Sequence, residues 1–465
     1  MKNKPFISNS LKPNRFKPEH PNEQITIYEG EFLIKWNERE VNVQGKIYFD
    51  WLPSLAIKFK GTTDNSFDAI NLFLDQVMEQ AELWLKNYRF GLVLITGIHD
   101  EVRKGINKIT ISGIDADAPI FGNVTEKVEK ITFLLPNFLV YNGDILRSEE
   151  NNRNSRMGKL ILETDDFLIT IDQTANHKNE VQELKSKGGY HCLHIGEIIH
   201  KNKLINLNET NEVLAALTSF LSFVNGRRTA PLFLEGFKNG ENVFTAFRIP
   251  KIDSYNDGFS WMPQTILEEL NSPWKAFYKL WVKNEDTEDV LFTVVHWYME
   301  ANKNSGFYQG ELIMATTALE LIFNWWMIIV KRKFGEKDEI SLSGKIRELL
   351  KEINHDTAVP DVFKNLHKYS QNADGESKDG PKVISELRNK LVHAKKKHRK
   401  AQREIPVIAR YEALKLSLSY IEMAILYILK YEYKYRDRAS TSIWRGGDEV
   451  FLPSSRSHPD NPKPH

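Results

Sequence analysis

The chain contains 465 residues, with a formal net charge of +1, 41% hydrophobic residues and a single cysteine, Cys192. The length and apolar content predict two or three well-packed globular domains, and the single cysteine excludes an intrachain disulfide framework and a cysteine-based zinc site. The near-neutral net charge neither supports nor excludes a polyanionic partner, which depends on local charge.

Residues 1–22 are polar, contain several prolines and lack an apolar run. This composition predicts a disordered tail without a signal peptide, so we expect a cytoplasmic protein. Residues 23–205 are predicted to form a β-rich domain. Apolar and polar residues alternate in segments such as 41–49, and residues 160–163 and 167–171 are expected to form a hairpin. One helix is expected at 67–87, from apolar residues at helical spacing.

Residues 206–286 are predicted to be a mixed helical connecting region. A helix at 213–224 should end at Asn225-Gly226, and a second at 262–282 should be broken at Pro273. Arg227 and Arg228 follow the glycine directly. Two interpretations of this loop stand equal: an anion-binding site, or a helix cap with exposed arginines.

Residues 287–438 are predicted to be all-α, followed by an extended C-terminal arm at 439–465. The predicted helices cover 288–303, 309–334, 341–352, 361–371, 381 to about 403, and 406–436. Two apolar stretches within them approach membrane-spanning length, but each contains ionisable residues that are costly at bilayer depth. Buried helices of a soluble bundle are therefore favoured, and no membrane partner is expected. The fold class is α+β and multidomain.

The residues with the clearest chemical potential lie on the predicted helix that starts at residue 381. Arg388 and His393 are separated by four residues, and Asn389 directly follows the arginine. Asn389 and His393 share a helix face, whereas Arg388 and His393 point roughly 140° apart. Two such helices facing each other across a two-fold axis would combine both pairs in one cleft. The spacing alone favours an ordinary helix surface, whereas its place in a helical bundle favours catalysis.

This pattern resembles the R-x4-H signature of HEPN ribonucleases, whose fold is an all-α bundle. The resemblance implies a homodimer with a composite active site that cleaves RNA without a metal or cofactor, leaving a 2′,3′-cyclic phosphate. His393 would act as general acid or base, because its proton equilibrium lies near neutral pH. Arg388 would stabilise charge on the phosphate, and Asn389 would orient His393 or contact the phosphate.

Basic residues surround and follow this motif. They are Lys390, Lys395, Lys396, Lys397, Arg399 and Lys400. A charge run is usually a solvated helix face. Its position just beyond His393 favours RNA docking through the phosphate backbone. The sequence does not select among RNA classes, of which tRNA is one.

Glu320 lies within the most apolar predicted helix. A buried carboxylate is costly unless it is paired, and Arg388 is the obvious partner. A glutamate that reaches solvent at the edge of the bundle is an equal alternative. The HEPN resemblance implies a supporting acidic residue in the corresponding helix, which favours a role for Glu320 in the site.

A β-rich region joined to a HEPN bundle is similar to the ApeA and YopA-like proteins of bacteria, which are linked to abortive infection against phage. The segments that carry this similarity are 223–228, 388–393, 435–438 and 444–447. The resemblance implies a toxic ribonuclease that the N-terminal region restrains until a phage-derived trigger releases it. The alternatives are a HEPN module that binds nucleotides or a partner protein without catalysis, and a structural scaffold. The presence of Arg388, Asn389 and His393 argues against a non-catalytic module.

Three histidines near the single cysteine are candidate metal ligands. His191 and His194, with His200 downstream, flank Cys192. On a strand His191 and His194 would point to opposite faces, so a structural role is favoured. Asp115 and Asp117 are better explained by turn chemistry. We therefore predict no metal ligands.

Overall fold

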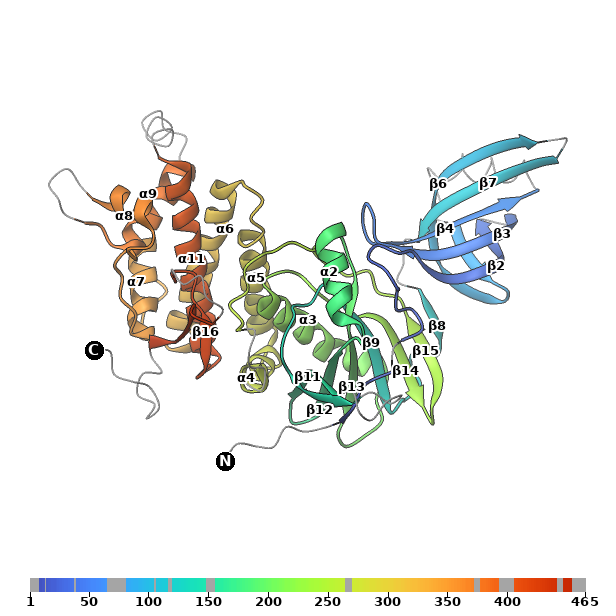
Figure 1. Cartoon of the computed structure of the whole chain (residues 1–465), viewed down its shortest axis with the longest axis horizontal. Helices are drawn as coiled ribbons and strands as arrows, with labels where there is room; N and C mark the ends of the chain where they lie inside the picture. The colour runs from blue at the N-terminus through green and yellow to red at the C-terminus, as the bar shows by residue number, and fades with distance from the viewer. Residues whose placement is uncertain are drawn as a thin grey trace.

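The structure is a computed structural model that describes residues 8–12, 14–36, 39–64, 81–103, 106–115, 119–147, 155–263, 270–371, 377–392, 405–440 and 446–453. It is an α+β multidomain fold, with a β-rich N-terminal region and a helical C-terminal part (Figure 1). This much of the predicted fold class is confirmed, and the assignment of the helices to a HEPN bundle stays a prediction.

Six antiparallel strands close into a barrel in the order β2-β3-β4-β7-β6-β5. Their bounds are Ile25–Trp36 (β2), Arg39–Asp50 (β3), Ala56–Thr63 (β4), Ala81–Leu85 (β5), Tyr88–Arg103 (β6) and Ile106–Asp115 (β7). The helix predicted at 67–87 is wrong for residues 81–85, and residues 65–80 lie outside the described part. Ala81, Leu83 and Leu85 are buried in alternation, and β5 pairs with both β2 and β6. The period of two and the pairing with neighbouring strands override the helical spacing.

A nine-stranded sheet, here called the central sheet, follows the barrel in the order β1-β10-β11-β12-β13-β9-β14-β15-β8. Its strands are Ser8–Asn9 (β1), Ile120–Gly122 (β8), Lys130–Pro136 (β9), Asp144–Arg147 (β10), Ser155–Glu163 (β11), Phe167–Gln173 (β12), Cys192–His200 (β13), Leu232–Lys238 (β14) and Glu241–Ala246 (β15). The predicted hairpin is confirmed as β11 and β12, with Leu162 opposite Ile169. Strands β14 and β15 come from the predicted connecting region, and β14 pairs with β9 inside the same sheet.

Part of the N-terminal tail packs against this sheet instead of being disordered as predicted. Phe16 is buried and stacks on Phe233, with ring centroids 5.3 Å apart. The side-chain amide of Asn14 donates a hydrogen bond to the carbonyl of Phe233 at 2.9 Å. The polar composition of the tail did not predict this packing, because the common partner of Asn14 and Phe16, Phe233, lies more than 200 residues further along the chain.

Both faces of the central sheet are buried. One face packs against the barrel, where Phe233 contacts Phe49 with ring centroids 5.0 Å apart. The other face shares one continuous hydrophobic core with helix α3 (Asn211–Asn225) and the helical part. The central sheet therefore lies between the barrel and the helices (Figure 1). Helix α2 (His177–Lys187) packs against β13.

The helical part surrounds a central helix, α6 (Tyr308–Phe323), which contacts α5, α7, α9 and α11. The described helices are Asn271–Trp281 (α4), Glu285–Ala301 (α5), Leu342–Ile353 (α7), Lys364–Ser370 (α8), Gly380–Val392 (α9) and Val407–Ile428 (α11). A π-helical segment, η3 (Asn324–Val330), continues α6. Pro273 lies in the first turn of α4, a position where proline is tolerated, and residues 264–269 of the predicted helix at 262–282 lie outside the described part of the chain.

The final predicted helix is too long at its C-terminus. Helix α11 ends at Ile428, two residues before Lys430, which has a positive φ of 55°. Residues Lys434–Arg436 then form strand β16, which pairs with β17 (Glu449–Phe451). Residues Glu449–Phe451 of the predicted extended arm therefore form a strand that pairs with the segment after α11.

Residues Tyr308–Val330 form a helix that is long and apolar enough to cross a membrane by those criteria alone. Within it, Ala315, Leu319 and Ile322 are buried in the core that α6 shares with its neighbours. This packing is consistent with the core helix of a soluble protein, as the sequence predicts.

Candidate functional site

Helix α9 holds the described part of the predicted catalytic motif. Its buried residues include Val383, Ile384 and Leu387, which repeat at helical spacing and pack into the core of the helical part. Arg388 and Asn389 follow this apolar stripe and are half-buried. The sequence therefore directs the arginine and the amide toward the edge of the bundle while its neighbours hold the helix in place.

Arg388 donates a hydrogen bond from Nη1 to Oδ1 of Asn389 at 3.3 Å. No carboxylate in the described part of the chain lies within ion-pair distance of Arg388. Its charge is therefore not neutralised by a described carboxylate.

Lys390, predicted to bind RNA, is engaged with α8. Its ammonium donates a hydrogen bond to the hydroxyl of Tyr369 and lies 5.2 Å from the centre of that ring. The remaining predicted site residues lie outside the described part of the chain, so their geometry is not defined. They are His393, Lys395, Lys396, Lys397, Arg399 and Lys400.

Glu320 is not the deeply buried carboxylate that its sequence context suggested. Its side chain is 37% exposed, and Oε1 accepts a hydrogen bond from Nζ of Lys345 at 2.7 Å. Lys345 lies on α7, which packs beside α6. The partner of Glu320 is therefore a lysine rather than Arg388, and the structure favours the alternative of a glutamate at the edge of the bundle.

A second polar cluster, which the sequence did not predict, joins the helical part to the end of helix α3. Arg438 is buried and donates to both oxygens of Glu422 on α11, at 2.7 to 3.0 Å. It also donates to Oδ1 of Asn302 at 2.7 Å, and Asn302 donates in turn to the carbonyl of Gly226 at 2.7 Å. We call Tyr298, Asn302, Glu422 and Arg438, with Gly226, the junction cluster.

The junction cluster brings together two segments that carried the family resemblance, 223–228 and 435–438. Gly226 ends α3 with a φ of +68°, and a β-carbon there would lie 2.2 Å from the carbonyl oxygen of Phe259. The hydroxyl of Tyr298 donates to Oε1 of Glu422, and burial followed by the Glu422 charge raises the pKa of Tyr298 well above its usual value. The polar groups of the junction cluster form hydrogen bonds with one another, which is typical of a structural role.

The two arginines after Gly226 are buried, so the exposure expected in one of the two interpretations is wrong, whereas the helix cap at Gly226 is confirmed. Arg228 donates to Glu300 at 2.5 Å and to Asp253 at 3.3 Å. Arg227 donates to the carbonyl of Asn256 and lies over the ring of Tyr255. Burial lowers the pKa of Arg227. The tight turn at Gly226 sends the chain back across α3 and carries both side chains inward.

His191 and His194 are both buried, and His194 lies among other rings. The ring of His194 stacks on Tyr141, with centroids 5.2 Å apart, and meets the edge of His177 at 5.1 Å. Burial lowers the pKa of His194 well below its usual value, and burial also lowers the pKa of His191. Across the described residues, no group of three or more His, Cys, Asp or Glu is arranged to hold a metal ion.

Comparison with known proteins places two domains on this chain. Residues 123–258 match the YopA central domain, and residues 284–448 match the YopA C-terminal domain. The chain is 28% identical over 443 residues to the SPbeta prophage-derived uncharacterized protein YopA of Bacillus subtilis (strain 168), which covers 93% of this chain and 95% of that protein. No solved structure matches the chain. The junction cluster and α9 both fall within these matches.

Proposed function

Starting from the two YopA domains, which support a YopA-like family for this chain, we propose that the helical C-terminal part is a metal-independent HEPN endoribonuclease. Arg388, His393 and Asn389 form its catalytic site, with the basic residues beyond His393 docking the RNA backbone. The active enzyme is a homodimer in which two copies of α9 face each other across one cleft.

In this mechanism a base, for which His393 is suited, removes the proton from a ribose 2′-hydroxyl. The 2′-oxygen then bonds to the adjacent phosphorus, the bond to the 5′-oxygen breaks, and an acid protonates that leaving oxygen. The products are a 2′,3′-cyclic phosphate and a free 5′-hydroxyl. Arg388 donates hydrogen bonds to the non-bridging oxygens as negative charge accumulates on them.

The observation that carries the proposal is the state of Arg388. It is half-buried at the edge of the bundle beside Asn389, and no described carboxylate is within ion-pair distance. An arginine that served only to stabilise the fold would more often have a carboxylate partner, as Arg347 has in Asp379. The guanidinium of Arg388 therefore has N–H groups available to donate hydrogen bonds to a phosphate. Glu320, through its bond to Lys345, is proposed as a supporting residue at most.

We further propose that the protein acts in bacterial defence against phage by abortive infection. A ribonuclease in the cytoplasm must stay inactive until it is triggered. The central sheet shares its core with the helices and packs on the barrel, so a change in the barrel has a physical route to the helical part. A phage component is the proposed trigger, and toxicity that is unaffected by loss of the N-terminal region would contradict this restraint.

The test compares the wild type with His393→Ala and Arg388→Ala on total bacterial RNA in the presence of EDTA. Lys382→Ala is the matched control, because Lys382 is an exposed cation on the same helix. We expect wild type and control to produce fragments with cyclic phosphate ends. His393→Ala should lose about 10²- to 10⁴-fold in rate, the usual contribution of general acid or base catalysis.

Equal cleavage by all four proteins would contradict the proposed site. If purified protein is silent without its trigger, the same variants are compared for toxicity on expression and for protection during phage challenge. Toxicity that disappears in His393→Ala and Arg388→Ala supports catalysis. Toxicity that persists in both favours the alternative function, a HEPN module that binds nucleotides or a partner without cleaving RNA.

A further inference from the structure

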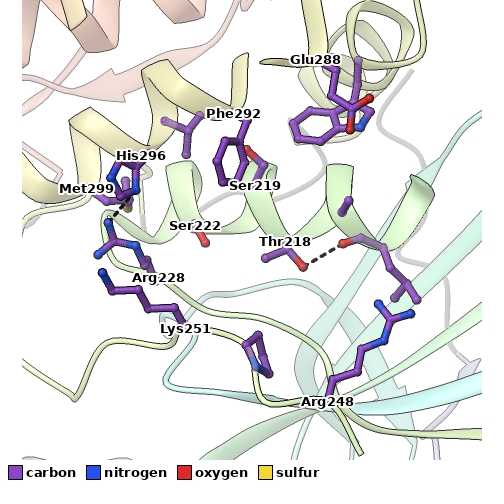
Figure 2. A pocket seen from close by; sticks show the side chains of 15 residues that line it. Thr218, Ser219, Ser222, Arg228, Arg248, Lys251, Glu288, Phe292, His296 and Met299 are labelled. Carbon is purple, nitrogen blue, oxygen red and sulfur yellow. Dashed lines mark hydrogen bonds between the residues drawn. The ribbon is translucent and has the colours of Figure 1, made fainter. Parts of the chain in front are cut away.

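A cavity of about 560 Å³ lies between α3 and α5 (Figure 2). Helix α3 lies within the residues that match the YopA central domain, and α5 lies within the residues that match the YopA C-terminal domain. The volume is within the range of cavities that hold small organic ligands, which is roughly 300 to 1,000 Å³.

The cavity has an apolar lining. Leu214 comes from α3, and Val295 and Met299 come from α5; all three are buried. The ring of Phe292, also on α5, lines the cavity while 58% of the residue is exposed. An aromatic ring left accessible beside an apolar wall can pack against the body of a ligand.

Polar atoms without partners also line the cavity. The hydroxyl of Ser219 and the indole nitrogen of Trp281 are buried, and neither has a hydrogen-bond partner in the described part of the protein. The neighbouring hydroxyls on α3 differ, since Thr218 donates to the carbonyl of Leu214 and Ser222 donates to the carbonyl of Thr229. Unpaired buried donors are costly, so these two groups indicate a place where a polar ligand atom would be stabilised.

The cations that line the cavity differ in whether a described carboxylate pairs with them. Arg228 is already paired with Glu300 and Asp253, and Lys251 lies 3.5 Å from Glu300. Arg248 donates only to the neutral side-chain oxygen of Asn211, and no described carboxylate pairs with it. Burial lowers the pKa of Arg248, because removal from water disfavours the charged guanidinium.

One acidic residue among those described lines the cavity, against three cations, Arg228, Arg248 and Lys251. Glu288 is the acidic residue among those that line it, and burial followed by the charge of Glu212 raises its pKa. His296 contacts Arg228 at 3.1 Å, and burial and that charge lower its pKa, which favours the neutral ring. The lining therefore attracts negative charge.

We propose that this cavity binds a small organic anion: an apolar body packed against Phe292 and the α3–α5 wall, with one anionic group held by Arg248. The inference does not depend on the ribonuclease proposal. A ligand bound here contacts both YopA domains at once, so its binding stabilises their association and raises the unfolding temperature.

The test uses 8-anilinonaphthalene-1-sulfonate, an aromatic anion whose fluorescence rises in apolar surroundings. We expect saturable binding of one probe per full-length chain and a rise in unfolding temperature. Arg248→Glu should weaken binding about tenfold or more, because it replaces a charge-assisted hydrogen bond with repulsion. Arg248→Lys should largely restore it, and Ala215→Trp should abolish binding by filling the cavity from α3.

The matched control is Phe307→Ser, which removes an exposed aromatic side chain outside the cavity and should leave binding unchanged. Circular dichroism of each variant verifies folding. Displacement by octanoate identifies a carboxylate ligand, and displacement by adenosine monophosphate identifies a phosphate ligand. Equal probe binding by all variants, absence of binding, or displacement by octanol as effective as by octanoate would each overturn the proposal.

Discussion

Arg438 and Arg388 lie in two regions of the helical part and differ in burial and in hydrogen bonding. Arg438 is buried, and its guanidinium bonds to Glu422, Tyr298 and Asn302. Arg388 is half-buried at the edge of the bundle and has a weak contact to its neighbour Asn389. Both sit in segments that carried the family resemblance, so sequence similarity alone did not distinguish their roles.

The hydrogen bonds and burial of the guanidinium thus separate a structural arginine from a candidate catalytic one. A buried arginine must be paired, because an isolated charge in the interior is very costly. An arginine that binds a phosphate must instead have donors available when the ligand arrives. Removing Arg438 should therefore damage the fold, whereas removing Arg388 should damage the function.

The largest expected effect is on stability, for Arg438→Met. Loss of Arg438 leaves the Glu422 carboxylate buried without a counter-ion, which should lower the free energy of unfolding by about 3–5 kcal/mol. Urea unfolding followed by circular dichroism measures it. The control is Arg89→Met, because the Arg89–Glu82 pair is largely exposed and should contribute about 0–1 kcal/mol. Equal losses in the two variants would contradict the assigned role of the junction cluster.

Arg388→Ala should show the reverse pattern. We expect RNA cleavage to fall about 10²- to 10³-fold, the typical effect of removing one group that stabilises the transition state. The free energy of unfolding should change by less than about 0.5 kcal/mol, because no described ion pair is broken. Cleavage rates and urea unfolding are measured on the same preparation. A stability loss as large as that of Arg438→Met would remove the distinction between the two arginines.

A smaller effect is expected at the turn that connects the two regions. Gly226→Ala places a β-carbon against the Phe259 carbonyl in a left-handed conformation, and Gly240→Ala has a similar φ of +83° but open space around it. Both should lose stability within about 1–3 kcal/mol, with Gly226→Ala at the upper end. The difference in thermal unfolding isolates the close approach. A larger loss for Gly240→Ala would show that the packing at Gly226 is unimportant.

The smallest effect concerns pH and the buried histidines. Burial holds the pKa values of His191 and His194 below their ordinary value of about 6.5. Below that pH the unfolded chain binds protons that the folded chain excludes, so stability is retained above about pH 6.5 and lost as the pH falls. The slope should reach at most about 1.4 kcal/mol per pH unit for each histidine.

Urea unfolding at pH 7.5, 6.5 and 5.5 tests this slope, which should be shallower in His194→Gln. Glu300 and Glu352 have pKa values lowered to about 2. The stability that these two carboxylates contribute is lost only as the pH falls below their ordinary pKa of 4.5, which is outside the tested pH range. Constant stability from pH 7.5 to 5.5 would contradict the prediction.

Local patterns in the sequence predicted much of the helical part. Helices at 288–303 and 341–352 were expected from apolar periodicity, and the structure has them as Glu285–Ala301 and Leu342–Ile353. Helix α3 ends at Gly226 as predicted, because a glycine in the left-handed conformation stops a helix through its own backbone. These features depend on residues close together in the chain.

Features that depend on distant residues were missed. Ala81–Leu85 became a barrel strand because β2 and β6 supply its hydrogen bonds. Glu320 reaches Lys345, and Arg438 reaches Asn302, only because separate helices lie side by side. The spacing of residues within one segment cannot predict these contacts, because the partner residues lie in other segments.

Local sequence patterns were enough to predict most helices of the C-terminal part, the hairpin of β11 and β12, and the motif Arg388-Asn389 with His393. Each follows from short-range periodicity or residue type. Three features become visible only in the folded chain: which arginine is paired, the burial of both faces of the central sheet, and the cavity between α3 and α5 with a cation that no described carboxylate pairs. The physical reason is that burial and charge pairing are properties of side chains brought together by folding, and the free energy of each depends on neighbours that the local sequence does not specify.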